Sequence, residues 1–378
     1  MSSRLKIVLM TTMTIALSCG FMHHLVDPAT LNFERLHIFL FNLCSGGTLL
    51  VYFTEDRKDK TLSIRGKIFF GLSLLFAFTA FFQLYAVTLV IPVLLALIIE
   101  SVRIDRFGSI LPVGLFTARE SVSRKFHQAS LLCLSLGLLI SSPVILNDVF
   151  THWITLEKLK LDTFFLGFSF PLSLISMSVI FALMREDKIL LISSLKEAIF
   201  WTINLGVIAF FIFILAQVYL PQVAISITLF CTVTLILYLY WHEGIRLQQK
   251  TFLTSGILFL LFTSITGIIY IFLAFSDSYD PVKAVPLLRV HGFTALYGWN
   301  LSGLAVISRH GDFPIKLHSR KVIMLHWLTV AVLCPVGYFI PLISIIAVLA
   351  YAWLLHMLLF NDGVIDQPLV EAEHGAFE

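Results

Sequence analysis

Long apolar runs, separated by short polar and charged segments, fill this 378-residue chain from end to end. Each run is about 20 residues long, which is enough for an α-helix to cross a hydrocarbon layer about 30 Å thick. A chain inside that layer must satisfy its own backbone hydrogen bonds, so each run is predicted to be a helix. The pattern predicts twelve spans, placed at Ile7–Met22, Leu36–Phe53, two within Ile68–Ile99, Ala129–Leu146, Thr163–Met184, Ile189–Val218, one that follows Leu220-Pro221 and ends near Tyr240, Phe252–Phe275, one within Pro286–His310, Val322–Phe339 and Leu342–Phe360.

The composition agrees with a membrane protein. Hydrophobic residues make up 58% of the chain and charged residues only 13%, whereas about a quarter of a soluble domain is charged. The first run lacks a clear small-residue cleavage site, so it is interpreted as a span and not as a signal peptide. The five cysteines fall inside apolar runs without disulfide or metal spacing and are interpreted as packing residues. We therefore predict an all-α integral membrane protein, with residues 1–378 as one polytopic domain that contacts the lipid bilayer.

The basic residues predict an orientation. With twelve spans, the side that holds both termini carries twenty Lys and Arg residues, and the opposite side carries five, namely Arg35, Lys158, Lys160, Lys283 and Arg289. Basic loops stay in the cytoplasm, so both termini are predicted to be cytoplasmic and the protein to lie in the inner membrane. Lys196 is the one basic residue within a span. Neighbouring helix positions do not face each other, so Lys196 and the adjacent Glu197 are expected to have separate partners or, as we favour, to extend to the membrane surface.

Three predicted spans, the second, sixth and tenth, open with the same pattern. Each begins with a basic residue, an aliphatic residue and a ligand-type residue, at Arg35–His37, Lys160–Asp162 and Arg289–His291. Each then has a phenylalanine two positions later, at Phe39, Phe164 and Phe293. Self-similarity at a fixed period indicates a repeat architecture. It predicts three four-helix repeats, about 1–126, 127–250 and 251–378, around a pseudo-threefold axis.

This arrangement resembles subunit I of the haem-copper oxidase superfamily: twelve spans, cytoplasmic termini, a pseudo-threefold of four-helix units, and histidines on spans two and ten. The resemblance implies a low-spin haem held near the outer face between His37 and His291. NnrS-like membrane proteins, which are tied to nitric oxide metabolism, are a looser comparison.

The chain also departs from that family. The sixth span opens with Asp162 where the family has a copper-ligand histidine, and no histidine lies between Phe164 and Met184. The seventh span lacks the family's histidine pair, and the tenth has only His291. No oxygen-reducing copper–haem site can be assembled, so the resemblance implies a non-oxidase relative without copper at the oxidase position. Whether the protein is an enzyme stays open.

The candidate cofactor is a single haem b with two histidine ligands, which suits electron transfer because no coordination position stays open. Arg35 and Arg289 are the candidate partners of the haem propionates. Two other interpretations remain: a non-haem metal or polar pocket, and structural hydrogen bonds between helices. The secondary candidates are Asp162, the outer histidines His23 and His24, and the pair His326 and His356, which lie at similar depth on consecutive spans.

Three functions follow from these alternatives. The first is electron transfer, or a gas-related or redox function, with a redox partner on the outer face. The second is a haem-free transporter, and the third is a metal-binding or scaffold protein. Nothing in the sequence indicates a nucleic-acid partner, and the oligomeric state stays open.

Overall fold

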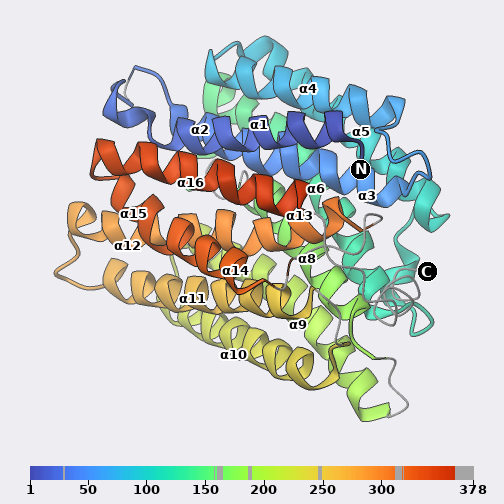
Figure 1. The fold of residues 1–378 in the computed structure, drawn as a ribbon. Helices are drawn as coiled ribbons and strands as arrows, with labels where there is room; N and C mark the ends of the chain where they lie inside the picture. The colour runs from blue at the N-terminus through green and yellow to red at the C-terminus, as the bar shows by residue number, and fades with distance from the viewer. Residues whose placement is uncertain are drawn as a thin grey trace.

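The computed structural model describes residues 1–28, 30–156, 158–159, 165–185, 190–245, 249–310, 317 and 319–361. These residues form helices that lie side by side in one bundle (Figure 1). Within them, nine helices are long and apolar enough to cross a membrane. They are Phe33–Glu55 (α2, η2 and α3), Ile64–Phe81 (α4), Tyr85–Phe107 (α5), Val122–Thr151 (α6 and η4), Leu190–Leu215 (α9), Tyr219–Glu243 (α10), Lys250–Ala274 (α11), Arg320–Gly337 (α14, η7 and α15) and Pro341–Phe360 (α16).

Three further helical segments coincide with the first, sixth and tenth predicted spans. They are α1 (Ser3–Gly20), η5 with α8 (Phe165–Ser169 and Phe170–Ala182), and α12, η6 and α13 (Pro281–Phe293, Thr294–Asn300 and Leu301–Ser308). Two short 3₁₀ turns, η1 (Met22–His24) and η3 (Val113–Phe116), lie between helices. The structure thus confirms a helical protein with apolar spans, and the total of twelve spans stays a prediction.

The second predicted span lies at the centre of the bundle. In the most apolar stretch of Phe33–Glu55, 89% of the residues are buried, against 22% for α9. Helix α9 packs mainly along α10, which packs along α11, and this group lies along the lower side of the view in Figure 1. Its exposed side chains are large and apolar, as a lipid-facing surface requires.

The second, sixth and tenth predicted spans meet one another. The π-helical stretch η2 (Phe39–Gly47) contacts η5, α3 (Thr48–Glu55) contacts α13, and α13 contacts α8. Each of the three spans also contains a π-helical stretch, η2, η5 or η6, near its outer end as we predict it. These stretches begin two or three residues after His37, Asp162 and His291. Such stretches are rare and occur often at functional sites.

Small residues allow the central helices to come close. A Cβ atom added to Gly137 in α6 would lie 2.3 Å from the Cα atom of Gly167 in η5. A Cβ atom added to Gly303 in α13 would lie 1.8 Å from the Oγ atom of Ser176 in α8. In a membrane, where apolar side chains gain little by leaving lipid, such close contact drives helix association.

The two ends of the described chain lie at the same end of the bundle. The Lys6 Nζ atom of α1 lies 6.0 Å from the centre of the Phe360 ring of α16. An even number of crossings requires this arrangement. The cytoplasmic location of that end stays a prediction.

Main-chain hydrogen bonds join the residues that directly follow α8 to the end of α10 (Tyr219–Glu243) and the two residues after it. Met184 and Gly244 form an isolated β-bridge. The Arg185 N–H donates to the Glu243 carbonyl at 3.0 Å, and the Ile245 N–H donates to the Leu183 carbonyl at 2.8 Å. The peripheral hairpin of α9 and α10 is thereby attached to a central helix.

We predict that Gly137→Ala destabilises the protein by about 3 kcal/mol, because the added methyl group meets main-chain atoms that cannot move aside. The control is Gly71→Ala in α4, where an added Cβ atom has no neighbour within 4 Å. The midpoint of thermal unfolding in detergent should fall for the first variant and stay equal or rise for the second, since alanine favours a helix over glycine. Equal midpoints would contradict the close packing of α6 on η5.

Candidate functional site

His37 lies in α2 (Phe33–Ile38) and is buried against α1. Its Nδ1 atom is 2.9 Å from the Ala16 carbonyl oxygen. The ring comes this close because Gly20 has no side chain, since a Cβ atom there would lie 2.9 Å from Nδ1. A main-chain carbonyl of the neighbouring helix therefore fixes the orientation of the imidazole.

The same contact fixes the tautomer of His37. A carbonyl oxygen only accepts hydrogen bonds, so Nδ1 carries the hydrogen and the neutral ring has its lone pair on Nε2. The Tyr297 hydroxyl oxygen lies 3.0 Å from Nδ1 as a second neighbour of that hydrogen. Within the described residues, Nε2 has no hydrogen-bond partner. This is the arrangement by which proteins hold a histidine as a metal ligand.

His291 in α12 has the same local arrangement against a different helix. Its Nδ1 atom is 3.1 Å from the Thr263 carbonyl oxygen and 3.2 Å from the Thr266 hydroxyl oxygen, both in α11. A Cβ atom on Gly267 would lie 3.1 Å from the Cε1 atom of His291. Here too the hydrogen lies on Nδ1, and Nε2 has a lone pair and no hydrogen-bond partner in the described part of the chain.

The two imidazoles lie on opposite sides of α12. His291 faces α11, whereas His37 meets α12 and η6 through Phe293 and Tyr297, at ring-centre distances of 6.5 and 5.5 Å. Phe293 follows His291 by two positions, which is a rotation of about 200° around an α-helix. The sequence pattern correctly placed both histidines near the same end of their spans, but it did not determine which way each one faces.

The directions of the two imidazoles bear on whether one haem can be held between His37 and His291. A haem with two histidine ligands needs both Nε2 atoms to point at one iron from opposite faces of the macrocycle. His37 and His291 do not share such a space, so a single haem between them does not fit this arrangement. Each histidine taken alone does fit the role of one axial ligand, because its Nδ1 atom is held and its Nε2 atom has a lone pair.

Arg289 and Arg35 differ in their surroundings. The Arg289 guanidinium forms an ion pair with Glu34, at the start of α2, and lies 4.2 Å from the centre of the Tyr338 ring. It therefore joins the second and tenth predicted spans at the ends where His37 and His291 lie. Arg35 is half-buried and has no ion pair in the described part of the chain. Glu34 was missed in the sequence because nothing in its spacing relates it to a residue 255 positions away.

His23 and His24 bind the end of another helix. The His23 Nε2 atom donates to the Tyr338 carbonyl at 2.8 Å, and the His24 Nε2 atom donates to the Gly337 carbonyl at 2.9 Å. Their ring centres are 4.2 Å apart, although adjacent residues of an α-helix would diverge. They converge because both rings reach adjacent carbonyls at the end of α15, those of Gly337 and Tyr338. Both use Nε2 to cap the last carbonyls of a helix, which favours a structural role.

His326 and His356 do not meet. His326 is 1% exposed, and its Nε2 atom donates to the Tyr297 carbonyl at 2.6 Å. His356 is exposed and lies between Trp353 and Phe360 on its own helix. The expected pairing from similar depth is therefore wrong, because the two side chains lie on different faces of their helices. His326 joins α14 to η6, and its Nδ1 atom is buried without a partner in the described residues.

Other expectations concern the sixth and seventh spans. Asp162 lies outside the described residues. Glu197 in α9 forms an ion pair of 2.6 Å with Lys125 of α6, whose side chain is 1% exposed, and Lys196 donates to the Arg185 carbonyl at 3.2 Å. The two adjacent residues thus use separate partners, which is one of the two expected arrangements and not the favoured one. Lys125 was not recognised as that partner because it lies two predicted spans earlier.

A scan against protein-family models, a search of curated proteins and a search of solved structures each found no match to this chain. Within the described residues, no group of three or more His, Cys, Asp or Glu side chains gathers as metal ligands would. The candidate site is therefore argued from the geometry of single histidines.

We predict that His326→Leu lowers the free energy of unfolding by about 1–3 kcal/mol, because the buried Tyr297 carbonyl loses its side-chain donor. His356→Leu is the matched control, because its side chain is exposed and should change the stability by less than about 0.5 kcal/mol. Thermal unfolding in detergent measures both. An equal loss in the two variants would contradict the assignment of His326 as the internal contact.

Proposed function

We propose that this chain is a multi-pass inner-membrane protein that binds haem b through single histidine ligands and serves a gas-related or redox function. His37 and His291 are the proposed ligands, each through Nε2 and each at its own position. The observation that carries this proposal is the shared arrangement of the two residues. In both, a main-chain carbonyl of a neighbouring helix holds Nδ1, and Nε2 has no hydrogen-bond partner in the described residues.

The surroundings of these histidines support the proposal. An ionisable side chain inside a membrane is costly and by default indicates function. His37 lies two residues before the π-helical stretch η2, and His291 lies three residues before η6; such stretches occur often at functional sites.

The contacts among the second, sixth and tenth predicted spans support the three-repeat scaffold that resembles haem-copper oxidase subunit I. In this proposal the second, sixth and tenth spans line the centre, and both termini are cytoplasmic. His37 and His291, which have the same place in the repeated pattern, face different spaces on either side of the tenth span. The scaffold then offers separate places for cofactors around one central helix.

A single histidine ligand changes the expected chemistry. Two histidines fill both axial positions of haem iron and suit electron transfer, whereas one leaves a position open to a gas ligand. Bound haem b would supply this open iron position, and the chain would hold and orient it. The proposed function is therefore the binding of a small gas molecule, and not electron transfer by a haem that two histidines hold.

A haem-free transporter is the second candidate, and one residue favours it. Asn42 in η2 is 1% exposed, and neither end of its amide has a hydrogen-bond partner in the described part of the chain. A buried polar group without a partner is rare and needs an explanation, such as a polar substrate that completes its hydrogen bonds. A protein that is purified without haem or metal would support this candidate.

We predict that the purified protein contains haem b and that the reduced protein changes its absorption spectrum when carbon monoxide is added, because an axial position is open. His37→Ala and His291→Ala should each remove part of the haem, and the double variant should remove all of it. The measurements are the haem content per chain and the reduced spectrum.

His356→Ala serves as the matched control, since this intramembrane histidine is exposed and makes no contact with either site. If each single variant removes all of the haem, the two histidines share one group and separate sites are wrong. If a protein from haem-replete cells is colourless, haem binding is wrong.

A further inference from the structure

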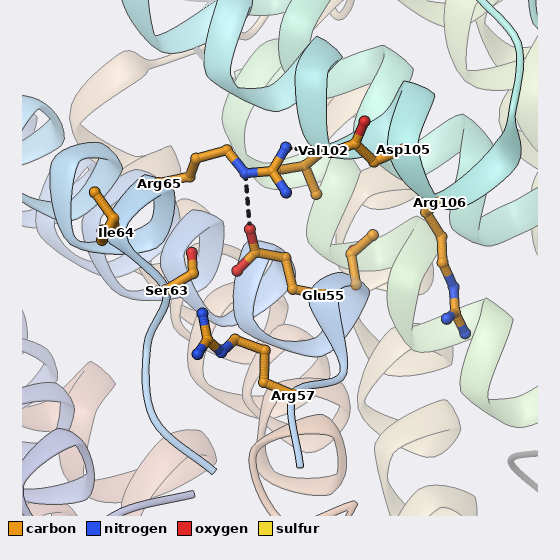
Figure 2. Close-up of a pocket in the computed structure, with 9 residues that line it drawn as sticks. Glu55, Arg57, Ser63, Ile64, Arg65, Val102, Asp105 and Arg106 are labelled. Carbon is orange, nitrogen blue, oxygen red and sulfur yellow. Dashed lines mark hydrogen bonds and ion pairs between the residues drawn. The ribbon is translucent and has the colours of Figure 1, made fainter. Parts of the chain in front are cut away.

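The second predicted span has polar neighbours at both of its ends, and they differ in kind. At the end far from His37, a polar cavity of about 440 Å³ lies where α3 and α5 end and α4 begins (Figure 2). Its carboxylates have a charged partner, because Arg65 pairs with Glu55 at 3.2 Å and also with Asp105. The neighbours of His37 Nδ1 are instead neutral, so what this imidazole can bind depends on where single hydrogen atoms lie.

The two proposed haem ligands differ in the hydroxyl group that lies beside Nδ1. His37 has the phenol of Tyr297 there, at 3.0 Å, and His291 has the hydroxyl of Thr266, at 3.2 Å. In both cases a main-chain carbonyl contacts the same nitrogen. The carbonyls are alike, so a difference between the two histidines must come from the hydroxyl groups.

The Thr266 hydroxyl can only accept a hydrogen bond from His291. Its own hydrogen is directed at main-chain carbonyls of α11, those of Thr263 at 2.9 Å and Phe262 at 3.1 Å. A hydroxyl group has one hydrogen to donate, so none is left for the imidazole. Both neighbours of His291 Nδ1 therefore favour the tautomer that has its hydrogen on Nδ1 and its lone pair on Nε2.

The Tyr297 hydroxyl differs because its hydrogen has no other acceptor in the described residues. The side chain is buried, and His37 Nδ1 is the one hydrogen-bond neighbour of its oxygen in that part of the chain. When His37 has its hydrogen on Nδ1, the phenol hydrogen stays unpaired, which is costly for a buried donor. When the hydrogen of His37 is on Nε2, Nδ1 accepts from the phenol.

The Ala16 carbonyl opposes this second arrangement. It lies 2.9 Å from Nδ1, and a carbonyl oxygen cannot form a hydrogen bond with a nitrogen that has no hydrogen. His37 thus has two neighbours that favour different tautomers, whereas the two neighbours of His291 favour the same one. A metal binds an imidazole through a nitrogen that carries a lone pair, so the tautomer decides whether Nε2 is a ligand.

We propose that Tyr297 gives His37 two tautomers, whereas Thr266 restricts His291 to the one that can bind iron. His291 is then available as a ligand in every molecule, and His37 only in a fraction of them. Tyr297 and Thr266 are positioning residues, since each acts through a histidine. The consequence for haem rests on the proposed function, but the tautomers are properties of the protein without haem.

Solid-state ¹⁵N NMR of the haem-free protein in lipid bilayers tests the proposal, with labelled histidine as the probe. A ring nitrogen that carries hydrogen and one that carries a lone pair give separate signals, and His37→Ala and His291→Ala assign them. His37 should show both tautomers and His291 only one. Tyr297→Phe should raise the ratio of the Nδ1–H form to the Nε2–H form of His37 by about fivefold, the effect of one net hydrogen bond.

Tyr351→Phe is the matched control, because it removes the same atom from a neighbouring ring. Tyr351 is buried, its hydroxyl has no hydrogen-bond partner in the described residues, and its ring centre lies 5.0 Å from that of Tyr297. The tautomer ratio of His37 should stay at the wild-type value in this variant. An unchanged ratio in Tyr297→Phe, an equal change in the control, or two tautomers at His291 would overturn the proposal.

Added haem separates this proposal from the proposed function. Iron on Nε2 selects one tautomer, so haem should remove the Nε2–H signal of His37 from the wild-type spectrum. If that signal persists at saturating haem, His37 is not a haem ligand and the proposed function is wrong at this position. The tautomer ratio in Tyr297→Phe still decides whether the phenol controls the hydrogen of His37.

Discussion

Five histidines of this bundle are satisfied by main-chain carbonyls of other helices, and the positions of their rings depend on this constraint. His37, His291 and His326 each donate to a carbonyl of another helix, and His23 and His24 in the turn η1 do the same. A membrane interior offers no water to complete these bonds, so each imidazole must find an acceptor in the protein. The same bonds decide which ring nitrogen is left for a ligand.

Small residues make those contacts possible. Gly20 and Gly267 let the rings of His37 and His291 lie directly against α1 and α11. Gly137 allows the backbone of η5 to approach α6. The candidate histidine positions and the packing of the centre therefore have the same physical cause, which is close approach of backbones without an intervening side chain.

The sequence predicted the helices well because length and hydropathy alone decide whether a segment can cross a membrane. The repeated pattern also singled out His37 and His291 as two ligand-type residues at the same place in their spans. The sequence did not predict the direction in which each histidine side chain leaves its helix. A repeat pattern gives the position of a residue along the helix axis and not its rotation around that axis. The pairing of His326 with His356 failed for the same reason. The π-helical stretches change the rotation further and carry no recognised sequence pattern, while the Arg289–Glu34 contact joins residues 255 positions apart.

The attachment of α10 to α8 consists of main-chain hydrogen bonds between Arg185, Ile245 and their partners. Such bonds do not use side chains, so a substitution breaks them mainly where it changes the backbone: proline at a donating position, or any side chain at Gly244, where a Cβ atom would lie 2.3 Å from the Tyr240 carbonyl oxygen. The exposed side chains of the hairpin can therefore change, to suit bilayers of different thickness or composition, while this main-chain link to the centre stays the same.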